Sequence, residues 1–550
     1  MATLTHKTID GEFLLLGYHE TPTLVPLHIQ SMKGTAPTRK LPSISFEQRN
    51  PSSSQPPSLS TDQQSASFVE LLIVLWQQHP KILGTTGITV ASLVLLLLWL
   101  AFAKRSPSVK EPRSVQTSRV NQYWQTEQVP DGWFPIGRIL YDPDRVLGRG
   151  CEGTVVYKGV FDGRPVAVKR VVLDFLNLAD REVAHLRESD MHPNVIRYFC
   201  MESDSQFRYI ALELCSATLQ DYVNDETVRS SCALSSATIL EQATAGLAHL
   251  HSLKIVHRDV KPQNVLLSHP NAHSQVRVLI SDFGLCKKLA FGRNSVSRRS
   301  GVTGTDGWIA PEALNSDAST CAVDIFSLGC IFYYVLTLGS HPFGDNWKRQ
   351  ANIMGGQYSM KELACTTEDP TSQAVIESMI TVESSARPTA AAVLKHPMFW
   401  DKKRVLAFFQ DVSDRVEKED QASPVLWRLE KNCRSVVRND WRKIICPALQ
   451  ADLRKFRSYR GNSVRDLLRA MRNKKHHYRE LPDDVRAALG SIPDQFVSYF
   501  CGRFPQLLMH VYQAMECVKR EDFFVGYYDQ TTEPAAHLQT DQTVAEAPSK

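Results

Sequence analysis

Residues 257–264 (HRDVKPQN) carry side chains whose types and spacing suit phosphoryl transfer. Asp259 can accept the proton of an attacking hydroxyl, Lys261 can stabilise the transferred group, and Asn264 can hold a magnesium ion. Asp282, the first residue of an Asp-Phe-Gly tripeptide, can provide a second metal ligand. These residues predict transfer of a phosphoryl group from ATP to a hydroxyl, with Mg²⁺ held by Asn264 and Asp282.

A glycine-rich segment upstream has the features of a nucleotide-binding loop. Its backbone can close over phosphates, and Lys169, in the strand-like sequence VAVK, can pair with the α- and β-phosphates. Glu182 lies in a stretch with helical periodicity and is the expected ion-pair partner of Lys169. Glu213 and Cys215 end an apolar strand-like run (YIALELC) and are expected to form the hinge facing adenine. The predicted nucleotide contacts are Leu147, Gly148, Gly150, Gly153, Val155, Lys169, Glu182, Glu213, Cys215, Asn264 and Asp282.

Together these motifs follow the order found in protein kinases. Lys261, two positions after Asp259, favours Ser/Thr over Tyr phosphorylation. Glu312, in an Ala-Pro-Glu tripeptide, closes the activation segment, and Arg387 is its expected buried partner. The sequence therefore predicts a Ser/Thr kinase.

Three serines of the predicted activation segment lie beside arginines that could bind a phosphate. They are Ser295, Ser297 and Ser300. Phosphorylation there could order the loop, and the alternative is that these serines only solvate a flexible loop.

A basic stretch after the kinase motifs suggests a second site. Residues 454–479 (RKFRSYRGNSVRDLLRAMRNKKHHYR) are rich in Lys and Arg and contain a single acid, Asp466. Cleaving RNA without a metal needs a base for the 2′-hydroxyl, an acid for the leaving 5′-oxygen, and donors for the phosphorane charge. His477 is the candidate acid, Arg472 and Asn473 are the candidate charge stabilisers, and Tyr459 is a candidate for activating or orienting the nucleophile.

Two other interpretations of this stretch remain open at this point. A basic helix could only bind anions or lipid headgroups. His476 and His477 could be a metal-ligand pair, but neither a Cys nor an acid stands at ligand spacing. The lack of a nearby carboxylate cluster in the sequence also argues against a two-metal nuclease.

The elements that would position these groups can be predicted from local patterns. Ser463 and Asp466 form a candidate capping box that opens a helix. The apolar residues of this helix fall on one face: Val464, Leu467, Leu468 and Met471. Arg469, Asn473 and His477 repeat at four-residue intervals on the other side and are expected to project together.

Composition limits the class of protein. The chain has 550 residues, a net charge of +5 and 43% hydrophobic residues, enough for several folded domains. None of its 12 cysteines precedes Cys151, and their spacing is irregular, which favours reduced thiols over a disulfide framework. The local concentration of positive charge, rather than the net charge, points to an anionic partner.

Residues 84–103 (GTTGITVASLVLLLLWLAFA) contain no charged residue and are predicted to span a membrane. Lys104 and Arg105 follow directly, so the positive-inside rule places the C-terminal part in the cytosol. Residues 68–82 suit either an interfacial helix or apolar juxtamembrane chain. Residues 31–66 have the Ser- and Pro-rich composition of disordered chain, and residues 1–10 lack signal-peptide features.

Taken together, the kinase motifs, the predicted span and RNKKHHYRELP resemble the inositol-requiring-enzyme family, the kinase/endoribonucleases of the unfolded protein response in the endoplasmic reticulum (ER) membrane. The resemblance covers about residues 84–530 and is most specific at residues 281–312 and 452–482. It implies that Tyr459, Arg472, Asn473 and His477 are ribonuclease residues and that Ser295 is one of three activation-loop phosphosites. It also implies homodimers or higher oligomers, trans-autophosphorylation, RNA stem-loop substrates, and ATP/ADP with Mg²⁺ at the kinase site alone.

The sequence departs from the family at its N-terminal end. The family has a large lumenal sensor, of which residues 12–22 (EFLLLGYHETP) resemble only the end. We therefore expect a truncated lumenal segment, and binding of lumenal chaperones or unfolded proteins is put in question.

The overall expectation is an α+β protein with a bilobal kinase fold, an all-α ribonuclease domain and one N-terminal transmembrane helix. Its expected parts are a truncated lumenal or disordered segment (1–83), the membrane helix (84–103), a cytosolic linker (104–140), the kinase (141–400), the ribonuclease (401–530) and a disordered tail (531–550). Two alternatives are a membrane Ser/Thr kinase whose basic module only docks partners or lipids, and a pseudokinase scaffold. Intact Lys169, Asp259 and Asp282 argue against the scaffold.

Overall fold

The computed structural model describes residues 129–150, 153–172, 176–289, 296–297, 304–315, 318–367 and 369–530. All of them belong to one structural unit, Glu111–Lys550. The predicted membrane span, the segment before it, most of the linker and the tail at 531–550 lie outside these ranges. Within the described ranges, no helix is both long and apolar enough to cross a bilayer.

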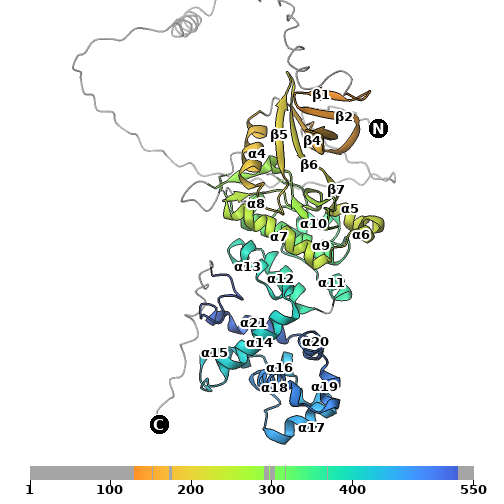
Figure 1. Ribbon diagram of the computed structural model, residues 1–550. Helices are drawn as coiled ribbons and strands as arrows, with labels where there is room; N and C mark the ends of the chain where they lie inside the picture. The colour runs from red at the N-terminus through yellow and green to blue at the C-terminus, as the bar shows by residue number, and fades with distance from the viewer. Residues whose placement is uncertain are drawn as a thin grey trace, which may run out of the picture. The chain divides into compact units, whose positions relative to one another are not determined.

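A six-stranded antiparallel sheet forms the N-terminal lobe, in the order β1-β2-β3-β4-β6-β5 (Figure 1). The alternating sequence of β4 buries Val166 and Val168 on one face, as expected for a half-buried strand. The first strands already begin within the predicted linker. The bounds are β1 Phe134–Ile136, β2 Ile139–Arg149, β3 Val155–Phe161, β4 Arg164–Val172, β5 Tyr198–Ser203, β6 Phe207–Glu213 and helix α4 Leu176–Ser189.

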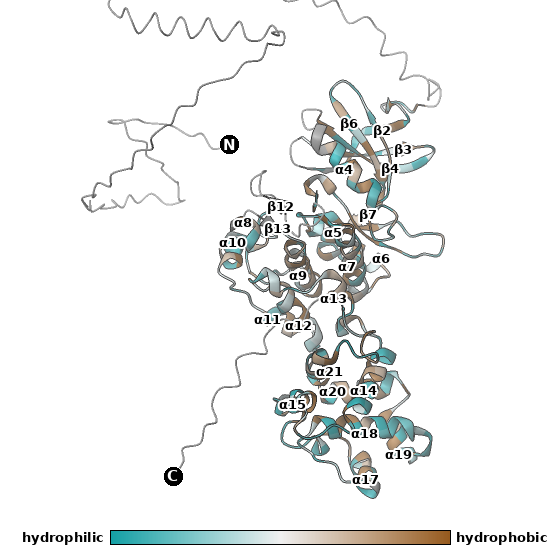
Figure 2. Ribbon diagram, turned by 90° about the vertical axis from the view of Figure 1, so that its left-hand side faces the viewer, coloured by the Kyte–Doolittle hydropathy of each residue, from teal (hydrophilic) through white to brown (hydrophobic). Residues whose placement is uncertain are grey.

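The second lobe is mainly helical and is centred on α7 (Ser236–Ser252) and α9 (Ala322–Leu336). Helix α9 is apolar almost throughout, and Figure 2 shows it mostly in the hydrophobic colours. The other helices are α5 Leu219–Asn224, α6 Glu226–Ser231, α8 Pro311–Asn315, α10 Asn346–Met354, α11 Lys361–Thr366, α12 Pro370–Met379 and α13 Ala390–Leu394. The short strands are β7 Cys215–Thr218, β8 Ile255–Val256, β9 Val265–Ser268, β10 Val278–Ile280, β11 Lys287–Lys288, β12 Val296–Ser297 and β13 Ala318–Ser319.

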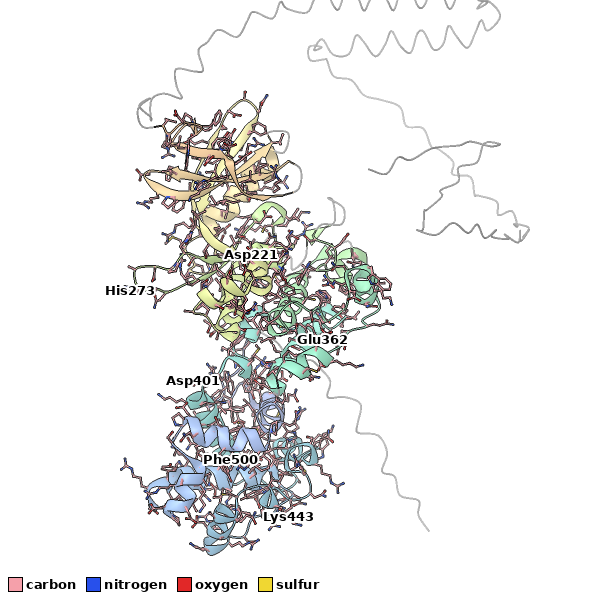
Figure 3. All side chains as sticks on the ribbon, turned by 90° about the vertical axis from the view of Figure 1, so that its right-hand side faces the viewer. Asp221, His273, Glu362, Asp401, Lys443 and Phe500 are labelled. Atoms are coloured by element: carbon pink, nitrogen blue, oxygen red, sulfur yellow. The ribbon has the colours of Figure 1, made fainter. Side chains whose placement is uncertain are left out.

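An all-helical module follows and has its own hydrophobic core. Asp401 caps its first helix, and Phe500 lies in its core; both are labelled in Figure 3. Its helices are α14 Lys402–Val416, α15 Pro424–Glu430, α16 Arg434–Val437, α17 Pro447–Phe456, α18 Val464–His476, α19 Asp483–Leu489, α20 Asp494–Arg503 and α21 Leu507–Met515. The predicted two-lobed α+β fold followed by an all-α module is thus confirmed, whereas the membrane helix stays a prediction.

The end of the helical module is hydrogen-bonded back to the second lobe. Thr389 Oγ1 donates to Asp529 Oδ2 (2.7 Å), and Lys395 Nζ donates to the carbonyl of Tyr528 (2.8 Å). These bonds connect the second lobe with the module.

Two candidate active sites

Lys169 lies at the centre of the first site. From β4, its ammonium group contacts Glu182 Oε1 of α4 (2.6 Å) and Asp282 Oδ1 (2.7 Å), which confirms the predicted ion pair with Glu182. Burial alone would lower the pKa of Lys169, but the two carboxylates outweigh it and raise the pKa. Lys169 in turn lowers the pKa of Asp282 to about 2, whereas burial raises that of Glu182. At neutral pH Asp282 is therefore ionised, as a metal ligand must be.

The predicted base, Asp259, is held through both carboxylate oxygens. Lys261 Nζ donates to Oδ2 (2.7 Å), and Thr305 Oγ1 donates to Oδ1 (2.7 Å). Asn264 Nδ2 donates to the Asp259 backbone carbonyl (2.9 Å) and to Oδ2 (3.0 Å). Because Asn264 and Asp282 both offer oxygen ligands beside Lys169 and Asp259, the residues present fit a bound Mg–nucleotide.

The loop before Asp259 is fixed by Asp324, a buried residue of α9 that the sequence analysis did not select. Asp324 accepts hydrogen bonds from the backbone N–H groups of His257 (2.8 Å) and Arg258 (2.7 Å) and from His251 Nε2 (2.9 Å). Burial acts to raise the pKa of Asp324, but the hydrogen bond and charge interaction with His251, together with His257 and the Arg258 N–H, outweigh it, so the net pKa is lowered. An acid within an otherwise apolar helix was the available signal, because such a charge needs partners.

The other predicted kinase elements occupy different parts of the fold. Arg387 forms a bidentate ion pair with Glu312 (2.6 and 2.9 Å), as expected. Glu213 ends β6 and Cys215 opens β7, so the predicted hinge is the short connection between these strands.

In the glycine-rich segment, the Gly150 N–H donates to the Thr154 carbonyl (2.9 Å) and Gly153 has φ = 75°. Val155 is buried, whereas Leu147 is half-exposed. Of the predicted phosphosites, Ser297 lies in β12, opposite Ala318 of β13. Ser295 and Ser300 lie outside the described residues.

The second site is built around α18, whose predicted apolar face is buried as expected. Ser463 caps the helix by accepting from the Asp466 N–H (3.2 Å). The predicted capping box is wrong in its other half, because the Asp466 carboxylate does not return to Ser463. It accepts instead from the backbone N–H of Arg460 (2.5 Å) in the preceding loop.

Tyr459 and Asn473 are brought together as predicted site residues. Asn473 Nδ2 donates to the Tyr459 hydroxyl (3.0 Å). This hydrogen bond connects the third turn of α18 with the loop that carries Tyr459. Tyr459 is buried, and its ring packs edge-on against Trp441.

The side chain of Arg472 does not join this pair and has other partners. Its guanidinium contacts Asp414 (2.6 Å) and Glu417 of the α14 region, and its side chain is only 7% exposed. Hydrogen bonding to Glu417 is the main reason that the pKa of Arg472 is raised. These two acids, from a segment more than 50 residues earlier in the sequence, were not expected here; they are close because α14 lies beside α18 in the fold. Even so, within the described part of the chain no three His, Cys, Asp or Glu residues are grouped to hold a metal.

His477 lies just past the helix, which ends at His476. Its Nδ1 contacts Glu480 Oε2 (3.0 Å), and its side chain is 65% exposed. Arg469 instead approaches Glu417 (3.8 Å). The expectation that Arg469, Asn473 and His477 project together is therefore wrong, since the contacts of these side chains lead to three different partners.

Comparison with known proteins finds a family match for each of the two regions that carry the candidate sites. Residues 141–399 match the family described as "Protein kinase domain", and residues 405–528 match "Ribonuclease 2-5A". The chain is 50% identical over 549 residues to the serine/threonine-protein kinase/endoribonuclease ire-1 of Caenorhabditis elegans, covering 96% of this chain and 56% of that one. It is 44% identical over 582 residues to the kinase/endoribonuclease IRE2 of Homo sapiens, covering 96% and 61%. The chain belongs to this kinase/endoribonuclease family.

A more distant member extends the similarity. The Schizosaccharomyces pombe protein "Sensor for unfolded proteins in the ER ire1" is 42% identical over 426 residues, covering 72% of this chain and 39% of that one. The chain spans between half and two thirds of the length of the C. elegans and human relatives. Its kinase domain implies the use of ATP, typically with Mg²⁺.

Several residues of this family member that hold the sites were not selected from the sequence. Thr305 stands in the segment GTDGWIAPE, whose resemblance was noted without a role for this hydroxyl. In the helical module, Lys474 and Asp452 form an ion pair in which both residues are buried. The signal for that pair was weak, because Lys474 is one of many cations in its segment.

Proposed function

We propose that this chain is a Ser/Thr protein kinase and a metal-independent endoribonuclease of the unfolded protein response. The observation that carries the proposal is the Tyr459–Asn473 hydrogen bond (3.0 Å), which joins two predicted ribonuclease residues. It lies in a Ribonuclease 2-5A module that follows a kinase site with a complete set of charged partners. The names of the relatives support both activities.

In the kinase reaction, Mg–ATP supplies the γ-phosphoryl group. Asp259 takes the proton of the substrate hydroxyl and is oriented by Thr305 and Lys261. Lys169, fixed by Glu182, binds the nucleotide phosphates, and the proposed phosphate acceptors are Ser295, Ser297 and Ser300 of a second copy. Phosphate there would meet the nearby arginines and order the activation segment.

In the ribonuclease reaction, the 2′-oxygen attacks the adjacent phosphorus, and the bond from phosphorus to the 5′-oxygen breaks. Tyr459, held by Asn473, orients the 2′-hydroxyl, which loses its proton to solvent water as it attacks, and His477 gives a proton to the leaving 5′-oxygen. Asn473 and Arg472 offset the charge on the phosphorane, for which Arg472 has to leave its contacts with Asp414 and Glu417. The products are a 2′,3′-cyclic phosphate and a free 5′-hydroxyl.

The cellular setting belongs to the same proposal. Residues 84–103 span the ER membrane once, the kinase (141–400) and ribonuclease (401–530) face the cytosol, and homodimers or higher oligomers are the active form. RNA stem-loops are cut in non-spliceosomal mRNA splicing and mRNA decay. The relative named as a sensor for unfolded proteins in the ER supports this location.

The test uses the full chain in detergent, phosphorylated with Mg–ATP and then transferred to EDTA. A labelled RNA stem-loop should be cleaved and should end in a 2′,3′-cyclic phosphate. Absence of cleavage alongside normal autophosphorylation would instead support a membrane kinase whose basic module docks partners or lipids.

A further inference from the structure

The loop that carries Tyr459, residues 457–461, is neither helical nor part of a strand, so its path depends on contacts with its neighbours. Trp441 Nε1 donates to the carbonyl of Arg460 (3.0 Å), and the Trp441 N–H donates to the carbonyl of Gly461 (2.9 Å). Arg442 donates to the carbonyl of Tyr459 itself (3.0 Å). The loop is thus held through its backbone on the side of Trp441 and Arg442.

Asp466 holds the loop from the other side. Its Oδ2 accepts from the Arg460 N–H (2.5 Å), the peptide group that directly follows Tyr459, and lies 3.9 Å from Arg460 Nε. Asp466 is buried and is the single acid of residues 454–479. A carboxylate that accepts from a backbone N–H makes a short, charge-assisted bond, which fixes the peptide more firmly than a neutral acceptor would.

Asp466 and Asn473 contact Tyr459 and its following peptide from one helix. They are seven residues apart on α18, so they lie on the same face, about 10 Å apart along the axis. Asp466 holds the peptide after Tyr459, while Asn473 donates to the hydroxyl of Tyr459. The helix therefore fixes both the base and the tip of this tyrosine.

We infer that Asp466 is a positioning residue of the ribonuclease site, acting through the peptide after Tyr459 to keep the tyrosine hydroxyl on Asn473. This inference rests on the proposed role of Tyr459 in cleavage. The local sequence suggests a different role for Asp466, since it reads as half of a capping box. A shift of about 1 Å at a reacting group can cost about a hundredfold in rate, so a small release of this loop has a measurable effect.

Glu430 provides a matched control at the same end of α18. Its carboxylate accepts from Ser463 Oγ (2.6 Å) and from the N–H groups of Val464 (3.1 Å) and Arg465 (3.1 Å). Glu430→Gln weakens the capping of the helix and leaves the Asp466–Arg460 contact in place. A merely structural role of Asp466 would make the two substitutions alike.

The experiment measures kcat and KM for cleavage of an RNA stem-loop by the phosphorylated full chain in EDTA. The variants are Asp466→Ala, Asp466→Asn, Glu430→Gln, Tyr459→Phe, and Tyr459→Phe combined with Asp466→Ala. We expect Asp466→Ala to lower kcat about tenfold or more with little change in KM. Asp466→Asn, whose amide oxygen still accepts, falls between, and Glu430→Gln keeps kcat near that of the unmodified chain. In the Tyr459→Phe background, Asp466→Ala has little further effect.

The outcomes distinguish failure of the positioning role of Asp466 from failure of the proposed role of Tyr459. A loss of kcat in Glu430→Gln equal to that in Asp466→Ala, or a full effect of Asp466→Ala in the Tyr459→Phe background, overturns the positioning role. The positioning role is also overturned if Tyr459→Phe lowers kcat while Asp466→Ala leaves it unchanged. A Tyr459→Phe protein that cleaves normally contradicts the proposed role of Tyr459 and removes the inference with it. Autophosphorylation and melting temperature, measured for each variant, identify any that fold poorly.

Discussion

The kinase site and the ribonuclease site of this family member differ in how their polar groups are held. In the kinase site, Lys169 contacts two carboxylates, and both oxygens of Asp259 accept hydrogen bonds. In the ribonuclease site, Tyr459 and Asn473 are joined, whereas the side chain of His477 is 65% exposed. Arg472 is engaged by Asp414 and Glu417.

This difference is the one that the sizes of the two proposed substrates would require. A nucleotide is small enough to be enclosed between two lobes, so the groups that bind it can be fixed in advance by one another. An RNA stem-loop cannot be enclosed by a module of this size, so the group that meets the scissile phosphate has to lie at the surface. The kinase site is assembled by contacts within one fold, while in the ribonuclease module His477, the proposed acid, is left exposed.

The largest expected effect on the kinase site comes from a substitution of Asp259. Asp259→Ala removes the base, and we expect autophosphorylation to fall by about 10²- to 10⁴-fold. Nucleotide binding through Lys169 is retained, so cleavage of RNA in the presence of ADP should persist. Incorporation of labelled phosphate and cleavage of a stem-loop, measured on the same sample, test this. Unchanged autophosphorylation would contradict the assignment of Asp259.

His477→Ala makes the reciprocal change. Because it removes the proposed acid, cleavage should fall by about 10²- to 10⁴-fold, and autophosphorylation should be unaffected, since His477 is exposed just past the end of α18. His476→Ala is the matched control, one residue earlier and also exposed. Loss of both activities in His477→Ala would indicate a folding defect rather than the loss of an acid.

The buried ion pair between Lys474 and Asp452 is expected to contribute to the stability of the helical module. Lys474→Met leaves Asp452 buried without its ammonium partner, and we expect the helical module to lose about 3 kcal/mol of unfolding free energy. Lys475→Met, at the more exposed neighbouring position, should have a much smaller effect. Denaturant unfolding followed by tryptophan fluorescence measures both. Equal effects would show that the Lys474–Asp452 pair contributes little.

The smallest expected effect concerns the junction between the two regions. Burial lowers the pKa of His396, whose ring packs edge-on against Tyr512 of α21, to about 3. The unfolded chain binds this proton below about pH 6.5, so the contribution of neutral His396 is complete above that pH and is lost as the pH falls toward 3. His396→Gln should reduce the loss of stability between pH 7 and pH 5 by about 2 kcal/mol, as seen in melting temperatures. An unchanged pH dependence would contradict this.

Local sequence predicted those features that depend on short-range periodicity and motif order. The buried face of α18 follows from Val464, Leu467, Leu468 and Met471, and it is found as expected. The Lys169–Glu182 and Glu312–Arg387 ion pairs follow from motif positions, and both are present. These outcomes could be predicted because the pattern that specifies each one is contained in the chain segments themselves.

The chemical groups that are present, and the helix or loop that carries each of them, can be predicted from the sequence alone. Only the tertiary structure decided which partner each group has. Arg472 is paired with acids of α14, Asp466 leaves its capping box for the Arg460 N–H, and Asp324 reaches back to the catalytic loop. The physical reason is that a buried charge is stable only beside a partner, and that partner can lie far away along the chain. The choice among many cations and acids is made when the helices pack.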